Sequence, residues 1–297
     1  MKTVALAVFV VLLFASPAFG DEVDEGLSNM ATTELKANTR QMIRAGIDTD
    51  DAIRMTRAML GSRFRQEQTL KAQEIVMRAC KEGLPVEPIM NKAHEGMAKR
   101  AQHENIIRAM EKVMSRYAFG YQQACKLTQK EAQKERIMEQ VAECVTAGMT
   151  DFDVDRLVYQ LKYRGQAMPK DEAVGLAIET FRAAKDITRL HVHSMKASDL
   201  ALEALKHHYG MREMASMRQS FMMHARDTSA NTVAEAYLEA ITQDNRLEGL
   251  DFSGGGTGSS VGSGHGSKGK GNGSSHGGGG ANRGSGRGSG GSRGGRR

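Results

Sequence analysis

The sequence predicts an all-α protein, either an irregular bundle or an array of helical hairpins, followed by a disordered tail rich in Gly, Ser and Arg. Three observations predict this class. Residues 21–251 contain three prolines, no tryptophan and many residues with good helix propensity, such as Ala, Met, Leu, Glu and Lys. The same residues show no convincing strand-like alternation and no Asn-Gly or Asp-Gly turn between apolar runs. The third observation is a series of corners at which one helix would end and the next begin.

The first twenty residues have the three parts of a secretory signal peptide. Lys2 supplies the positive charge, Val4 to Ala15 is an unbroken apolar run, and Ala18-Phe19-Gly20 places small residues where signal peptidase reads them. Cleavage would make Asp21 the N-terminus and leave no transmembrane segment, so the protein is expected to be periplasmic or extracellular. The alternative is that residues 1–20 are retained as a membrane anchor.

Four corners in residues 21–251 share one chemistry. Each places a glycine before a large apolar residue: Gly46-Ile47, Gly83-Leu84, Gly148-Met149 and Gly210-Met211. Glycine adopts the left-handed conformation that ends a helix, and the next residue folds back onto the last turn. Helix start signals follow the first three corners: Asp48 or Thr49, Pro85 with Glu87, and Thr150 with Asp153. The irregular spacing of the four glycines favours an irregular array over a regular solenoid.

Apolar periodicity and these start and stop signals predict eleven helices. Thr128 and Glu131 have capping-box spacing and would open the sixth. The predicted ranges are 32–45, 50–60, 63–82, 86–99, 103–118, 128–146, 151–163, 170–186, 188–208, 211–225 and 230–243, of which the eighth and ninth are candidates for one continuous helix.

The C-terminal residues 252–297 differ sharply from the body in composition. They hold 21 of the 33 glycines, no acidic residue and seven cations. Lys2 is in the signal peptide, so residues 21–251 keep 33 basic residues against 35 acidic ones. The tail is therefore a flexible linker or a polyanion contact without base specificity, because it offers no aromatic platform for bases. The cations are Lys268, Lys270, Arg283, Arg287, Arg293, Arg296 and Arg297, and His265 and His276 leave weak metal binding open as a third reading.

Cysteine use is sparse, with Cys80, Cys125 and Cys144 in segments of helical pattern. One disulfide would be possible after export, but the sequence does not identify the pair. There is no CxxC motif, which disfavours a thioredoxin-like site. We also find no zinc-protease helix motif after His94 and no nucleophile-elbow motif.

The stretch from Cys80 to Val113 resembles a segment of uncharacterised exported bacterial proteins. The shared elements are the corner Gly83-Leu84-Pro85, then Lys92, then Glu95-Gly96-Met97-Ala98-Lys99, then an amphipathic run from Ile106 to Val113. The resemblance covers about a tenth of the chain. It implies export and helical hairpins, and it carries no activity or site residues.

Residues 189–226 are rich in Met and His, which together suit copper, especially Cu(I). Met211, Met214 and Met217 have a spacing that fans them over one side of a helix. The competing interpretation is that these methionines are apolar core residues. The candidate copper ligands are Met211, Met214, Met217, His207, His208 and His224.

These patterns predict an exported interaction or scaffold protein, whose helical surfaces engage a protein partner or another copy and whose cationic tail contacts anionic envelope polymers. A copper-binding envelope protein is the alternative, and an enzyme of unknown class is the third reading. The sequence assigns no catalytic residue, no cofactor other than this copper alternative, and no specific nucleic acid.

Overall fold

The structure is a computed structural model that describes residues 19–244 together with Leu247 and Leu250. The chain divides into two units, Met1–Gly254 and Gly255–Arg297, and the described residues all belong to the first. Residues 1–18 of the predicted signal peptide and the predicted disordered tail lie outside the described residues.

Twelve α-helices and one 3₁₀ helix form the described part of the chain, in which no strand occurs. The predicted all-α array of hairpins is therefore confirmed. None of the described helices is both long enough and apolar enough to cross a membrane. The elements are α1 Phe19–Leu27, the 3₁₀ helix Ser28–Met30, α2 Thr33–Arg44, α3 Thr49–Gly61, α4 Gln66–Lys81, α5 Glu87–Ala98, α6 His103–Leu127, α7 Glu131–Ala147, α8 Asp151–Gly165, α9 Lys170–Arg189, α10 Ser194–Lys206, α11 Met211–His224 and α12 Ala230–Thr242.

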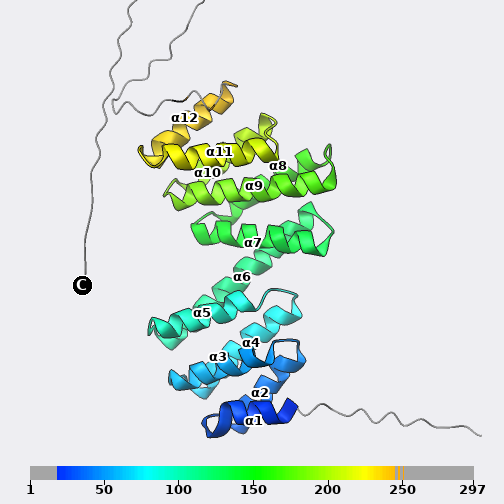
Figure 1. Cartoon of the computed structure of the whole chain (residues 1–297), viewed down its shortest axis with the longest axis vertical. Coiled ribbons are helices and arrows are strands. Elements are labelled where there is room, and N and C mark those ends of the chain that lie inside the picture. Colours follow the sequence, from blue (N-terminus) through cyan, green and yellow to red (C-terminus); the bar gives the residue numbers. More distant parts are fainter. Residues whose placement is uncertain (1–18, 245–246, 248–249, 251–297) are drawn as a thin grey trace, which may run out of the picture. The chain divides into compact units, whose positions relative to one another are not determined.

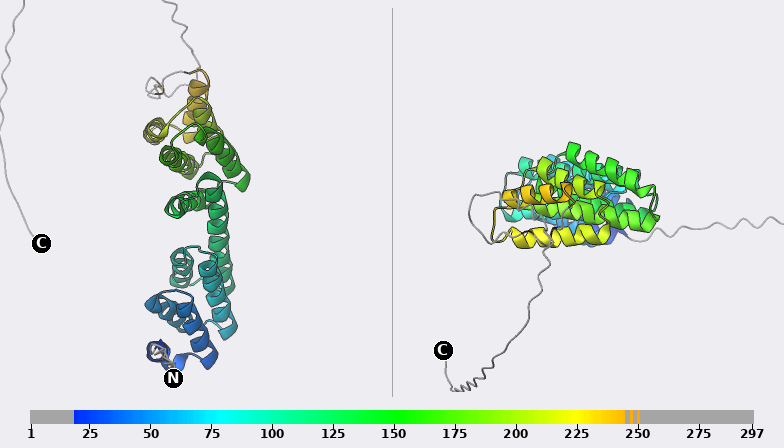
Figure 2. Two further views of the ribbon diagram at one scale, coloured as in Figure 1. Left: turned by 90° about the vertical axis from the view of Figure 1, so that its right-hand side faces the viewer. Right: turned by 90° about the horizontal axis from the view of Figure 1, so that it is seen from above.

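The helices pack as two layers, because each hairpin sends its two helices to opposite sides (Figure 1; Figure 2, left). In one layer the even-numbered helices follow one another from α2 to α12, each in contact with the next. In the other layer, α1, α3 and α5 form one group and α7, α9 and α11 form a second. The long helix α6 packs against both α5 and α7, and so it joins the two groups.

Three of the predicted glycine corners are confirmed. Gly46, Gly83 and Gly148 have φ angles of +101°, +70° and +108°. At each corner the next residue donates its N–H to the carbonyl five residues earlier, as at Ile47 to Met42 (3.2 Å). The glycine N–H reaches the carbonyl three residues earlier, which completes the Schellman pattern.

The fourth predicted corner is wrong in detail. Gly210 has extended backbone angles and is the N-cap of α11. The left-handed residue is His208, with φ +62°, and Tyr209 donates to Ala204 (3.0 Å). Arg63 and Arg100 close α3 and α5 in the same way, although a side chain in this conformation costs roughly 1 kcal/mol. The packing of the neighbouring helices offsets that cost, so arginine and histidine can occupy these positions. A search of the sequence for glycine therefore misses the corners.

Two of the helix boundaries also differ from prediction. The helix predicted over 103–118 continues to Leu127, since Gly120 and the polar residues that follow do not interrupt it. The helix predicted over 170–186 extends to Arg189, and the helix predicted over 188–208 begins only at Ser194, after the N-cap His193. The two helices are therefore not continuous.

One helix starts later than predicted, and another was not predicted. The helix expected to open at Thr128 begins instead at Glu131, after the N-cap Lys130, and Thr128 is the C-cap of α6. Helix α1 was not predicted at all. Its Val23 and Leu27 form a small buried cluster with Ile53 of α3, and so the acidic start of the body is anchored by two apolar side chains.

Helices α6 and α7 approach each other closely at Gly120. A Cβ atom at this position would lie 2.6 Å from the backbone oxygen of Met138. The two helices approach this closely only because Gly120 has no side chain. Figure 1 shows α6 running from α5 toward α7.

A buried carboxylate joins α8 to α10. Asp153 accepts hydrogen bonds from Thr150 Oγ1 (2.7 Å), from Ser198 Oγ (3.2 Å) and from Ser194 Oγ. Thr150 Oγ1 also accepts from the Asp153 N–H (3.1 Å), which confirms Thr150 as the N-cap of α8. Four polar groups are therefore satisfied together at one helix junction.

Candidate binding surface on α6 and α8

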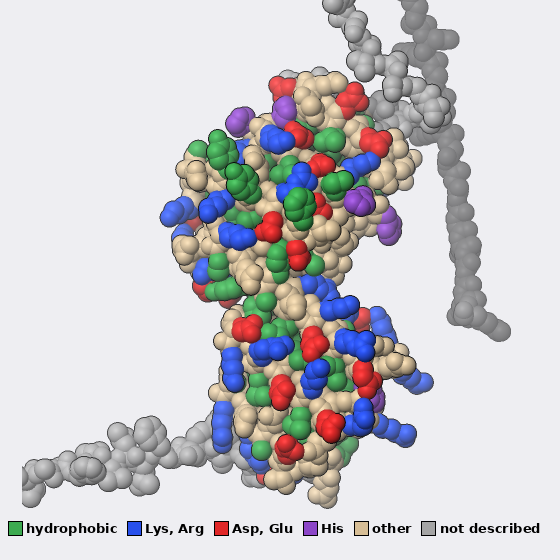
Figure 3. Space-filling model, turned by 180° about the vertical axis from the view of Figure 1, so that it is seen from behind, with side chains coloured by type: hydrophobic (Ala, Val, Ile, Leu, Met, Phe, Trp, Pro, Cys, Tyr) green, Lys and Arg blue, Asp and Glu red, His purple; other side chains and the backbone are tan. Residues whose placement is uncertain are grey.

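Three aromatic side chains project from α8 into solvent. Phe152, Tyr159 and Tyr163 are 70%, 76% and 66% exposed, and they are the exposed aromatic residues of the described chain. Their spacing of seven and four residues places them within about 40° of one another around the helix axis, with rises of ~10 Å and ~6 Å between successive rings. We call these three residues the aromatic stripe. Figure 3 shows hydrophobic side chains gathered on the upper part of this face.

The stripe is the outer face of a helix whose inner face is already occupied. Val154, Leu157, Val158 and Leu161 are buried in the main core. Helix α8 therefore has two apolar faces, and one of them has no partner among the described residues. Exposed aromatic surface of this kind marks a binding site more often than scattered exposed apolar residues do.

A hollow of about 270 Å³ lies at the C-terminal end of α8, where Lys162 and Gly165 line it on either side of Tyr163 in the sequence. Its walls come from the end of α6, the loop before α7, the end of α8 and the start of α9. Four lysines line it, one from each of these segments, and its lining contains no acidic residue. We call this the lysine hollow, and its lysines are Lys126, Lys130, Lys162 and Lys170.

Two of the four lysines are paired and two are not. Lys126 Nζ lies 3.0 Å from Asp155, and Lys130 Nζ lies 3.0 Å from Asp171. Hydrogen bonds from Lys130 and Gln133 lower the pKa of Asp171. Lys162 and Lys170 have no ion-pair partner among the described residues. The hollow therefore has uncompensated positive charge beside an exposed aromatic surface.

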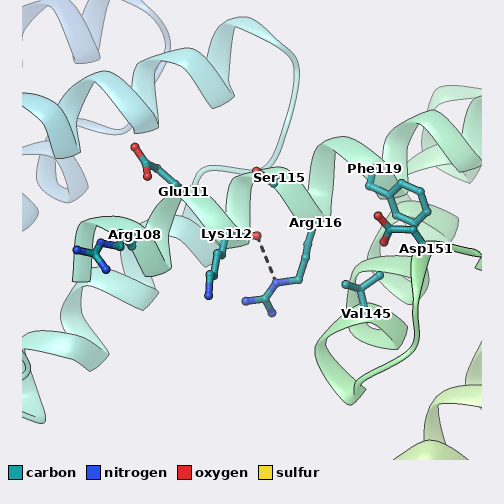
Figure 4. A pocket seen from close by; sticks show the side chains of 8 residues that line it. All are labelled: Arg108, Glu111, Lys112, Ser115, Arg116, Phe119, Val145 and Asp151. Carbon is teal, nitrogen blue, oxygen red and sulfur yellow. Dashed lines mark hydrogen bonds between the residues drawn. The ribbon is translucent and has the colours of Figure 1, made fainter. Parts of the chain in front are cut away.

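A second hollow, of about 480 Å³, lies where α6 meets the corner between α7 and α8 (Figure 4). Arg108, Lys112 and Arg116 line it at four-residue intervals along α6. Arg116 is committed to Thr146 Oγ1 (2.6 Å) and to the Lys112 carbonyl (3.3 Å). Glu111 and Asp151 share the lining, so this hollow is closer to neutral than the lysine hollow.

The candidate copper ligands do not come together as one set. Met214 and Met217 are 0% and 1% exposed in the main core, whereas Met211 is 41% exposed. Met211 and His224 stand at opposite ends of α11, a helix of 14 residues, and so they lie roughly 20 Å apart. The burial of Met214 and Met217 fits the competing core interpretation.

The three candidate histidines are also dispersed. His207 Nδ1 lies 3.8 Å from Asp244, and His208 forms the left-handed corner after α10. His224 Nδ1 lies 2.9 Å from the Tyr237 hydroxyl. In the described part of the chain, no three His, Cys, Asp or Glu side chains are grouped as a metal site would require. Copper binding stays a prediction, limited to subsets of the six residues.

The three cysteines are free, so the disulfide that the sequence left open is not formed. Cys80 Sγ donates to the Ala45 carbonyl (3.1 Å), and Cys144 Sγ donates to the Phe181 carbonyl (3.2 Å). Burial raises the pKa of the Cys144 thiol, which disfavours the nucleophilic thiolate. These contacts are structural.

No protein-family model, curated protein or solved structure matches the chain. The class is therefore defined by fold and surface: an all-α array of helical hairpins with an aromatic stripe on α8 and a cationic hollow lined by segments from α6 to α9. The predicted polyanion contacts of the tail, Lys268 to Arg297, lie outside the described residues.

Sequence reasoning missed the aromatic stripe, although the signal was present. The segment from Phe152 to Tyr163 repeats aromatic residues at the helical period, opposite to the buried apolar stripe. A search for a second apolar face on each predicted helix would have found it. The lysine hollow had no such signal, because its four lysines come from separate segments that only the tertiary fold brings together.

Proposed function

We propose that the chain is an exported helical scaffold that binds an anionic polymer of the cell envelope. The observation that carries the proposal is the tail, which holds seven cations, no acidic residue and 21 glycines within 46 residues. A segment of this composition is expected to attract polyanions by counterion release.

The geometry of the body supports binding over catalysis. The thiol of Cys144 is buried and donates to a backbone carbonyl, and the candidate copper ligands are dispersed. Among the surfaces that the body presents to solvent are the aromatic stripe of α8 and the lysine hollow. Export supplies the setting, since anionic glycans and lipids are the polyanions available outside the cytoplasm.

Export predicts a defined mature N-terminus. The chain recovered from the exported fraction should begin at Asp21 and retain Val23 and Leu27, the residues that anchor α1. Intact mass measurement reads this directly. A chain that keeps Met1 and stays in the cytosol would refute export.

Truncation after Asp251 tests the role of the tail. We expect the truncated protein to keep its helicity and Tm, because the core is built from residues within the body, and to lose most of its affinity for duplex DNA, used here as a rigid polyanion. For the full mature chain, log affinity against log salt should have a slope no steeper than about −6, since seven cations contact at most seven phosphates.

The comparison is made by titration of both proteins at two salt concentrations, with circular dichroism as the folding control. Equal affinity of the two proteins for duplex DNA would contradict the proposal that the tail is the polyanion tether. A large loss of helicity on truncation would show instead that the tail supports the body.

A further inference from the structure

We propose that the aromatic stripe and the lysine hollow together form a second site, on the body itself, for an anionic polysaccharide of the uronic-acid type. This inference deepens the proposed function and takes its extracellular setting from it. It does not depend on the tail, because every residue that carries it lies in α6 to α9.

The aromatic stripe supplies flat surfaces of the kind that sugar rings pack against. The face of an aromatic ring carries partial negative charge, and the axial C–H groups of a pyranose ring carry partial positive charge, so the two faces attract one another. Tyr159 and Tyr163 stand ~6 Å apart along α8. Phe152 is partly engaged, since the Arg156 guanidinium lies 5.9 Å from its ring centre, so the two tyrosines are the principal platform.

The lysine hollow supplies the charge that selects an acidic sugar over a neutral one. Lys162 precedes Tyr163 on the same helix, and Lys126 reaches across to Asp155 of α8. Lys162 lies about 100° around the helix from Tyr163, so a polymer that stacks on the tyrosines and turns around the end of α8 would reach the hollow, where Lys162 and Lys170 have no carboxylate partner among the described residues. Carboxylates of the ligand would complete these charge pairs.

The two features also agree in their extent. From Phe152 to Lys162 the site follows α8 for roughly 15 Å, which is longer than one sugar ring. A polymer with a ring and a charge in every unit can occupy both parts at once, whereas a small anion would use only the hollow. Several weak contacts to one polymer molecule together add affinity, so no deep pocket is needed.

The test uses the full mature chain and four polymers that separate ring from charge. Polygalacturonate has both, its methyl ester keeps the rings without the charge, polyphosphate has charge without rings, and single-stranded DNA has bases in place of sugars as the stacking unit. The variants are Tyr159→Ser with Tyr163→Ser, and Lys162→Gln with Lys170→Gln. Their matched controls are Met223→Ser, which removes another exposed apolar side chain, and Arg44→Gln with Lys81→Gln, which removes the same charge elsewhere.

We expect the tyrosine pair to weaken binding of polygalacturonate about tenfold and to leave binding of polyphosphate unchanged. The lysine pair should weaken polygalacturonate several-fold more than the Arg44 and Lys81 control does. Wild-type protein should prefer polygalacturonate to its methyl ester. All variants change exposed side chains, so circular dichroism should match the wild type.

Three results would overturn the proposal. Unchanged affinity of the tyrosine pair for polygalacturonate would remove the stacking platform. Equal losses of affinity in the Lys162 and Lys170 variant and in the Arg44 and Lys81 control would mean that the lysines act only through the net charge of the protein. A larger loss on single-stranded DNA than on polygalacturonate would make this a nucleic-acid site. None of these results bears on duplex DNA binding by the tail, so the two proposals fail separately.

Discussion

Gly120→Ala should lower the free energy of unfolding by about 2–3 kcal/mol, which is the range for an overpacked core site. The new Cβ atom would lie 2.6 Å from the backbone oxygen of Met138 and 3.3 Å from its Cα. A backbone atom cannot swing away as a side-chain tip can, so α6 and α7 must move apart. Alanine gains ~1 kcal/mol over glycine in helix propensity, and the expected loss is what remains after that gain. Thermal unfolding should show a Tm lower by roughly 5–10 °C.

Gly61→Ala is the matched control. Gly61 ends α3 in helical conformation, and a Cβ atom there would meet nothing within 4 Å. The same substitution should therefore raise stability by up to ~1 kcal/mol. If both variants shift the Tm in the same direction, the close approach of α6 and α7 does not determine the cost at Gly120.

The hairpin class was predictable because its local signals are strong. Gly46, Gly83 and Gly148 have no side chain to oppose a positive φ angle, and each is followed by a large apolar residue. Each of these corners forms as expected. These signals act over six residues and do not depend on what packs nearby. The same is true of the N-caps Asp48 and Thr150, whose side chains accept from N–H groups three residues on.

Prediction failed where tertiary packing overrides local preference. Arg63, Arg100 and His208 take left-handed conformations that a sequence search reserves for glycine. Helix α6 continues through Gly120, a residue that a propensity argument counts against a helix, because α7 packs on it at that point. The structure also shows a regular spacing of corners that the glycines alone do not reveal. The left-handed corner residues Gly46 and Gly83 are 37 residues apart, and so are the left-handed corner residues Arg63 and Arg100 that alternate with them.

The candidate site shows the same division. The aromatic stripe is a one-helix pattern and was readable from Phe152, Tyr159 and Tyr163. The lysine hollow joins segments from Lys126 to Lys170, and no spacing rule relates them. The dispersal of the copper candidates was likewise not visible in sequence, because neighbouring positions on α11 divide between core and solvent only once α9 packs on that helix.

Asp153→Asn should lower the free energy of unfolding by about 2 kcal/mol at pH 7, within the range for removing one partner from a buried hydrogen-bonded network. The carboxylate accepts from Thr150, Ser194 and Ser198. An amide replaces one accepting oxygen with a donor, so hydroxyl groups that now donate must turn away or clash. Asp155→Asn is the control, since that carboxylate is half exposed and forms a surface ion pair with Lys126, and it should leave stability nearly unchanged.

The effect of Asp153 should also depend on pH in a defined direction. Burial by itself would raise the pKa of Asp153, but hydrogen bonds from Ser194, Thr150 and Ser198, together with the charge of Arg156, outweigh it and lower the pKa from its ordinary value. A carboxyl group whose pKa is lower in the folded state stabilises the fold above the unfolded pKa, and it loses that contribution as pH falls through the folded pKa. Urea unfolding of wild type and Asp153→Asn should therefore differ most at neutral pH, and the difference should shrink below about pH 4. A difference that stays constant from pH 7 to pH 2.5 would mean that the carboxylate charge contributes nothing and that Asp153 acts through its shape alone.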